Sequence, residues 1–130
     1  MIFGIGTDIT RVKRFERWLL NEDMIFRVFN KDEFFPIEPD KSSDRKMQAA
    51  LEHYAARFAA KEAFAKALGT GLRFNASDVC VLKEESGKPY LKLYDSALKL
   101  CNSLVGEKYL IHLSLSHEKE YAVATVIIEI

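Results

Sequence analysis

Five residues of one segment could act together on a phosphorylated substrate. Phe58, Glu62 and Lys66 recur every four positions, so in a helix they lie on one face. Arg57 and Lys61 form a parallel row one position round the same helix. A Glu and a Lys at this spacing also describe an ordinary exposed salt bridge, which contributes only about 0.3–0.5 kcal/mol. A catalytic interpretation of Glu62 therefore needs a second carboxylate from elsewhere in the chain.

Asp8 is the candidate for that second carboxylate. It ends a strand that we expect over residues 2–8, directly after a hydrophobic segment. The alternative is that Asp8 caps the N-terminus of a following helix. Two carboxylates from separate elements can hold one magnesium ion, which prefers oxygen ligands and keeps water and phosphate oxygens around it. Asp8 and Glu62 thus predict a magnesium site for a pyrophosphate substrate, whose charge Lys66 and its basic neighbours would balance.

A second polar group lies near the C-terminus. His112, Ser114, Ser116 and His117 close an alternating segment that predicts a strand over residues 109–116. A serine–histidine nucleophile would need an acid to orient the histidine and glycines around the serine, and the sequence places neither there. The group is therefore either a polar strand face or a set of hydroxyls and imidazoles that bind a phosphorylated ligand.

These residues must be positioned by a mixture of strands and helices. The longest predicted element is an alanine-rich helix over residues 44–68, capped by Ser43 or Asp44 and ended by Gly69. The other expected elements are helices over residues 11–20 and 95–105, short helical pieces over 23–35, a loop over 36–44, and strands over 2–8, 78–84, 89–94, 109–116 and 121–129. This order predicts an α+β fold, in which an antiparallel sheet packs against the long helix. The length of 130 residues suits one domain, residues 1–130.

Composition excludes several classes of protein. The net charge is zero, from 19 basic and 19 acidic residues, which argues against a nucleic-acid-binding protein. No apolar run is long enough to span a membrane, and no signal peptide is visible, so we expect a cytoplasmic protein. Residues 11–17 are locally basic, with Arg11, Lys13, Arg14 and Arg17 against Glu16. A patch of this kind suits an acidic protein partner.

Three segments together resemble one known family, the holo-acyl-carrier-protein synthases. The first is Gly4-Ile5-Gly6-Thr7-Asp8-Ile9 followed by Arg14. The second runs from Arg57 to Gly69, RFAAKEAFAKALG, and has a core of Lys-Glu-Ala followed by a lysine. The third is His112-Leu113-Ser114-Leu115-Ser116-His117. Their order, their spacing and the short length all agree with that family across most of the chain.

The resemblance implies an enzyme, a phosphopantetheinyl transferase of the short type that forms a homotrimer with active sites between subunits. Its substrates would be coenzyme A and an acyl carrier protein, its cofactor Mg²⁺ and its pathway fatty acid biosynthesis. Asp8 and Glu62 fall on the magnesium-ligand positions, and Lys66 on a catalytic lysine that contacts the coenzyme A phosphates. The residues placed at or near the coenzyme A cleft are Arg57, Lys61, Lys66, Gly69, Pro89 and His112. Arg14, with Arg17, falls on the helix that docks the carrier protein.

Three other functions compete with this interpretation. A non-catalytic binding module could carry the same basic helix, although binding alone does not need Asp8, Glu62 and Lys66 together. A magnesium-dependent phosphohydrolase would use water where the transferase uses a serine. A structural subunit would leave the charged row at 57 and 61 and the histidines of the late strand unexplained.

Overall fold

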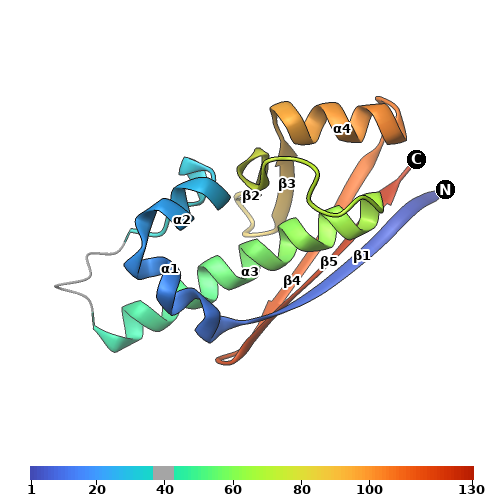
Figure 1. The fold of residues 1–130 in the computed structure, drawn as a ribbon. Coiled ribbons are helices and arrows are strands. Elements are labelled where there is room, and N and C mark those ends of the chain that lie inside the picture. The colour runs from blue at the N-terminus through green and yellow to red at the C-terminus, as the bar shows by residue number, and fades with distance from the viewer. Residues whose placement is uncertain (37–42) are drawn as a thin grey trace.

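The computed structural model describes residues 1–36 and 43–130, and its elements alternate in type along the chain (Figure 1). The strands are β1 (Ile2–Arg11), β2 (Val79–Lys83), β3 (Pro89–Leu93), β4 (Leu110–His117) and β5 (Tyr121–Glu129). The helices are η1 (Val12–Phe15), α1 (Glu16–Leu20), α2 (Glu22–Val28), η2 (Lys31–Glu33), α3 (Asp44–Leu68), η4 (Ala76–Asp78) and α4 (Asp95–Val105). The fold is α+β, as predicted. The loop predicted over residues 36–44 falls mostly on residues 37–42, outside the described residues.

The main sheet is antiparallel and has the strand order β1-β5-β4. On β5, residues alternate in burial, and the even-numbered ones from Ala122 to Ile128 are fully buried. They face α3, which lies across the sheet (Figure 1). Strand geometry then puts the odd-numbered residues of β5 on the opposite face. The sheet therefore has one face in the core and one face turned outward.

Close contact between β1 and α3 depends on glycine and alanine. A Cβ atom on Gly4 would lie 2.0 Å from the carbonyl oxygen of Ala67, and one on Gly6 would lie 1.9 Å from that of Ala63. Only glycine fits at these two strand positions. Helix α3 is capped at its N-terminus by Ser43, whose hydroxyl accepts a hydrogen bond from the Lys46 N–H, and at its C-terminus by Gly69 with φ of 83°, as the sequence predicts. This packing brings β1 and the C-terminal half of α3 side by side.

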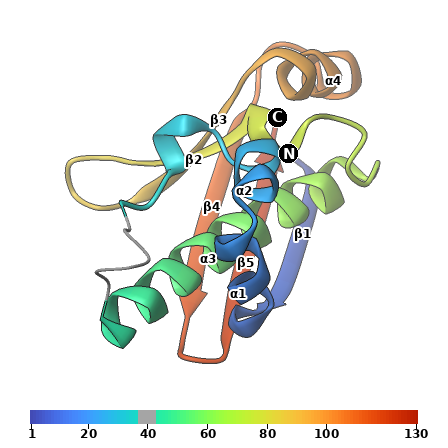
Figure 2. The same cartoon turned by 60° about the vertical axis from the view of Figure 1, so that its left-hand side comes forward.

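The remaining elements cover other parts of α3. The helices α1 and α2 lie beside its N-terminal half and α4 lies near its C-terminal end (Figure 2). Strands β2 and β3 form a separate two-stranded hairpin and not an extension of the main sheet. Two groups of buried apolar side chains result, one between α3, the sheet and the hairpin, and one under the N-terminal helices. Among the described residues, no helix combines the length and the apolar character needed to cross a membrane.

Two predicted boundaries differ from the structure. Strand β1 continues to Arg11, because Arg11 still pairs with Tyr121 of β5. Asp8 therefore lies inside the strand and not at its end, and it does not cap a helix. The helix predicted over residues 11–20 consists of a 3₁₀ turn, η1, followed by α1, and its N-terminal residue Arg11 makes no side-chain capping bond.

Candidate functional site

The candidate site is formed where β1 crosses the C-terminal half of α3. Asp8 lies on β1 and its side chain is only 15% exposed. Its Oδ1 accepts a hydrogen bond from Nζ of Lys66 at 3.1 Å, and its Oδ2 accepts one from the Thr10 hydroxyl at 2.8 Å. Lys66 Nζ also donates to the backbone oxygen of Thr7 at 3.0 Å. The ion pair of Lys66 thus joins the helix to the strand, and the pairing of Lys66 with Glu62 considered from the sequence is not formed.

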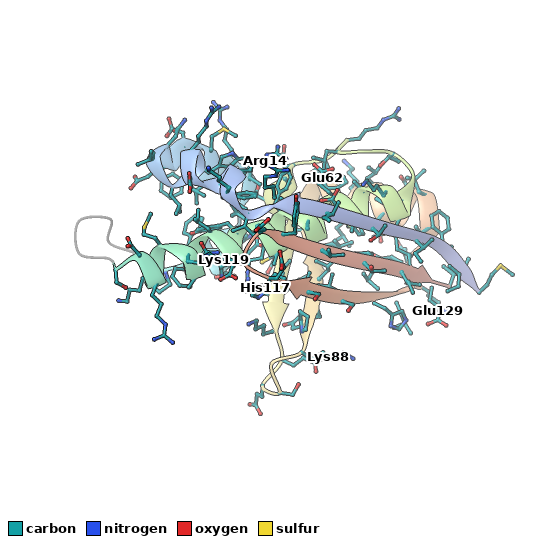
Figure 3. The ribbon with its side chains drawn as sticks, turned by 90° about the horizontal axis from the view of Figure 1, so that it is seen from below. Arg14, Glu62, Lys88, His117, Lys119 and Glu129 are labelled. Carbon is teal, nitrogen blue, oxygen red and sulfur yellow. The ribbon has the colours of Figure 1, made fainter. Side chains whose placement is uncertain are left out.

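Glu62 completes the group from one helical turn before Lys66. Burial raises the pKa of Glu62, and the negative charge of Asp8 raises it further, while Lys66 and Arg14 act in the opposite direction. The two carboxylates are therefore close enough to repel each other. Figure 3 shows Glu62 beside Arg14 along the β1 side of the molecule. The structure thus brings together Asp8, Glu62 and Lys66, the three residues that the sequence predicts to be catalytic.

This pair of carboxylates fits a magnesium ion. A cation between Asp8 and Glu62 would offset both the burial of the Glu62 carboxylate and the negative charge of Asp8, which together raise the pKa of Glu62. No cluster of three or more His, Cys, Asp or Glu side chains suited to a metal occurs in residues 1–36 and 43–130. Two protein ligands would leave most of an octahedral shell to water and substrate oxygens, the arrangement that magnesium commonly has with phosphate substrates.

Arg14 is held beside this group by aromatic rings. It lies on η1, and its guanidinium carbon is 4.9 Å from the ring centre of Phe58 and 5.8 Å from that of Trp18. Phe58 belongs to the same helical row as Glu62, so the spacing seen in the sequence places this ring one turn from the carboxylate. Arg17 is exposed on α1. The basic segment therefore adjoins the candidate site.

Lys61 does not face the site, contrary to the sequence-based interpretation. It is completely buried, and its Nζ lies 2.7 Å from Oε1 of Glu33, which is also buried. The remaining N–H groups of Lys61 donate to the backbone oxygens of Ala76 and Val79. All its donors are used inside the protein, so Lys61 cannot also bind coenzyme A.

Glu33 is the residue that sequence reasoning missed. Its carboxylate accepts from Lys61, from the Asn30 N–H and from the Val81 N–H. The one local signal was the pair Asn30 and Glu33 three positions apart, which forms a capping box at the start of η2. Nothing in the sequence linked this turn to the lysine 28 positions away.

The other predicted ligands are spread more widely. Arg57 is half-buried on α3 and Gly69 ends that helix. Pro89 begins β3 in the hairpin, where the neighbouring Lys88 lies well away from Glu62 (Figure 3). His112 pairs with Glu129 at 2.9 Å, at the end of the strand pair opposite His117 (Figure 3). It alternates with the core-facing Ile111 and Leu113, so it lies on the outward face and does not join Asp8 and Glu62 within one chain.

His117, which belongs to the late motif, lies 3.6 Å from Glu52 of α3 through its Nδ1. The two histidines of the motif therefore lie toward opposite ends of β4. Ser114 and Ser116 are both exposed on the outward side of the same strand. These positions support the polar-face interpretation of this motif within a single chain.

Known proteins resemble the chain over its whole length. A family model described as the 4′-phosphopantetheinyl transferase superfamily matches residues 4–126. The holo-[acyl-carrier-protein] synthase of Treponema denticola is 44% identical over 130 residues, which cover 99% of each chain.

Solved structures agree with this likeness. The crystal structure of a holo-(acyl-carrier-protein) synthase from Bacillus anthracis in complex with CoA (3′,5′-ADP) is 34% identical with a TM-score of 0.73, covering 99% of this chain and 97% of that one. The synthase from Neisseria meningitidis is 31% identical with a TM-score of 0.79, covering 99% of both. The chain therefore belongs to the 4′-phosphopantetheinyl transferase superfamily and, within it, to the holo-acyl-carrier-protein synthases.

Proposed function

We propose that this enzyme transfers the 4′-phosphopantetheine group from coenzyme A to a serine of an apo acyl carrier protein. The observation that supports this most strongly is the group of Asp8, Glu62 and Lys66, in which Lys66 pairs with Asp8 of β1 and lies one helical turn after Glu62 of α3. A phosphohydrolase could use the same group, but the full-length likeness to synthases favours the transfer reaction. The proposal includes a role in the fatty acid biosynthesis of the cytoplasm.

The reaction exchanges one phosphorus–oxygen bond for another. The serine hydroxyl attacks the phosphorus that carries the pantetheine arm and gives up its proton to water, and adenosine 3′,5′-bisphosphate leaves with the bridging oxygen. Phosphoryl transfer depends mainly on positioning and on neutralising negative charge. Lys66 is suited to the second task, because its ammonium group is half-exposed beside Asp8. Arg57 would bind a coenzyme A phosphate, and Gly69 and Pro89 would line the cleft.

Asp8 and Glu62 would hold a magnesium ion. When bound, such an ion neutralises the charge of the pyrophosphate and stabilises the leaving oxygen. The two carboxylates come from a strand and a helix that are fixed against each other by the contacts of Gly4 and Gly6 with α3. The carboxylates are thereby preorganised for one cation.

The acyl carrier protein would dock on the basic segment around Arg14 and Arg17. The rings of Phe58 and Trp18 restrict the Arg14 guanidinium near Glu62, so docking there would bring the carrier serine to the site. We expect Arg14→Glu to raise KM for the carrier about tenfold or more, because a rim charge governs encounter with a partner of opposite charge. Coenzyme A binding, measured by calorimetry, should stay unchanged, and an equal loss for both substrates would contradict this role.

We further propose that the chain acts as a homotrimer with its sites between subunits. The outward face of the main sheet exposes apolar residues of β1, with Ile5 64% and Ile9 65% exposed, and apolar strand faces of this kind mark association surfaces. His112 lies on this same face, so it would meet the site of a neighbouring subunit and not that of its own chain.

Mass spectrometry of an apo acyl carrier protein tests the proposed reaction. The carrier is incubated with the enzyme, coenzyme A and Mg²⁺, and then with a chelator in place of Mg²⁺. A mass increase of one phosphopantetheine that requires both the enzyme and Mg²⁺ is the expected result. Release of adenosine 3′,5′-bisphosphate with no modified carrier would instead support a phosphohydrolase.

A further inference from the structure

Glu33 of η2 contacts two members of a row of three basic residues on α3. His53, Arg57 and Lys61 lie at steps of four, so they follow one another along the helix. The carboxylate of Glu33 pairs with Lys61 at 2.7 Å, and its backbone oxygen lies 2.5 Å from Nε2 of His53. Glu33 thus contacts the residues one turn before and one turn after Arg57, and its negative charge acts on the arginine between them.

The Glu33–Lys61 pair is closed on itself. Both residues are buried, at 1% and 0% exposure. Each polar atom of the two side chains has a partner. Beyond the pair itself, these partners are backbone groups of Asn30, Val81, Ala76 and Val79. The charge of Glu33 is therefore neutralised by Lys61 and not by Arg57.

Arg57 keeps unused hydrogen-bonding capacity as a result. Its Nη1 donates to the backbone oxygen of His53 at 3.3 Å, while its Nε is buried without a hydrogen-bond partner. Within residues 1–36 and 43–130, no carboxylate lies within ion-pair distance of the guanidinium. Burial lowers the pKa of Arg57, and Glu33 is the negative group that most opposes this shift. Glu33 is thus the internal group that could capture Arg57.

We propose that Lys61 is a positioning residue that engages Glu33 and thereby keeps Arg57 available to a phosphate group of coenzyme A. This inference rests on the proposed function. Without Lys61, the Glu33 carboxylate would keep its backbone donors but would be a buried negative charge with no opposite charge beside it, which is strongly unfavourable. The neighbouring Arg57 would relieve this by pairing with Glu33, and the arginine would then be lost to the substrate.

Calorimetric binding of coenzyme A by the purified enzyme tests the proposal without relying on turnover. The variants are Arg57→Ala, Lys61→Met and the double variant Glu33→Gln/Lys61→Met. We expect the two single variants to bind coenzyme A about tenfold or more weakly, the usual effect of losing a charged hydrogen bond. The double variant should recover most of the affinity, because it has no carboxylate that could capture Arg57.

The recovery separates positioning from direct contact with coenzyme A. If Lys61 contacted coenzyme A itself, the double variant would bind as weakly as Lys61→Met or more weakly, and this would overturn the proposal. If Lys61 only stabilised the fold, Lys61→Met would lose coenzyme A binding only to the extent that it loses folded structure, and this would also overturn the proposal. Thermal unfolding of every variant shows whether lost binding follows lost structure. Lys99→Met, on the exposed side of α4, removes a lysine elsewhere and should bind as the unmodified enzyme does.

The design also covers a Lys61→Met variant that does not fold. The double variant has no buried lone charge, so its affinity then carries the test: near-normal binding supports the proposal and weak binding of the folded double variant overturns it. A normal affinity of Arg57→Ala would overturn the role of Arg57 and this inference while the transferase proposal stands. Failure of the unmodified enzyme to bind coenzyme A would instead overturn the proposed function.

Discussion

At the scale of single residues, Glu62 combines a functional demand with a cost to stability. Its raised pKa, caused by burial and then by Asp8, means that its ionised form is disfavoured in the folded protein. Glu62 therefore does not reduce the free energy of unfolding at low pH, where it is neutral. It reduces that free energy as the pH rises through its raised pKa, because the folded protein must then hold the ionised carboxylate. We expect Glu62→Gln to raise the melting temperature in metal-free buffer at neutral pH.

The same substitution should lower carrier modification about 100-fold or more, because it removes a ligand of the proposed metal. Mass spectrometry of the carrier measures the rate, and calorimetric scanning measures the melting temperature. Glu107→Gln, at an exposed position after α4, is the matched control and should change neither. A Glu62→Gln enzyme of normal rate would show that Glu62 is not a metal ligand.

His53 makes a separate prediction about pH. Burial, followed by the charge of Arg57, lowers its pKa from 6.5 to about 4, so the folded protein keeps it neutral while the unfolded chain protonates it near pH 6.5. Its contribution to stability is therefore present above pH 6.5 and is lost as the pH falls toward 4, by about 3 kcal/mol at most. Urea unfolding at pH 7 and pH 4.5 should show a smaller difference for His53→Gln than for the unmodified chain. An unchanged difference would show that other groups cause the acid sensitivity.

Residue types, spacing and the resemblance of three local motifs to one family were sufficient to predict that Asp8, Glu62 and Lys66 act as one group, and the structure places Asp8 beside Lys66. They did not predict that Lys61 is buried, because its spacing of four residues from Arg57 is the same as that of two exposed residues on one helix face. Its role depends on Glu33, whose position under the hairpin follows from the tertiary fold. A basic residue inside a motif can therefore be buried, and the sequence carries no signal that separates this case from a ligand-facing one.

At the scale of elements, the contact between β1 and α3 positions the site. Because a Cβ on Gly6 would lie 1.9 Å from the carbonyl oxygen of Ala63, Gly6→Ala must push the strand away from the helix. Asp8 lies two residues further along this strand, so it would move away from Glu62. We expect a loss of about 3 kcal/mol of unfolding free energy and a loss of turnover per folded molecule.

Gly106→Ala is the matched control for this prediction. It introduces the same methyl group at a left-handed glycine, with φ of 96° after α4, where no atom is close. It should lower stability through backbone strain but leave turnover per folded molecule unchanged. Equal turnover in the two variants would show that this strand–helix contact does not position the carboxylates.

The elements themselves were largely predictable, since the alanine content of α3, the residues at its two ends and the alternation of β4 are clear in the sequence. The end of β1 was not predictable, because its last residue, Arg11, pairs with Tyr121, which lies 110 positions later in the chain. The separation of β2 and β3 from the main sheet likewise depends on which strand edges meet in space. Such boundaries are set by tertiary contacts that no local pattern encodes.

At the scale of the whole molecule, the outward face of the main sheet predicts the assembly. Ile5 and Ile9 are more than half exposed on β1, and burial of such a face is the main driving force for association. By light scattering, we expect the unmodified enzyme to be a trimer and the double variant Ile5→Asp/Ile9→Asp to be a monomer. Circular dichroism should show that the double variant is still folded. If the sites lie between subunits, the monomer should also lose carrier modification. The control is Leu98→Asp, which changes an apolar side chain of α4 that is 40% exposed and should leave the trimer intact. If the unmodified enzyme is a monomer with full activity, the proposed assembly is wrong.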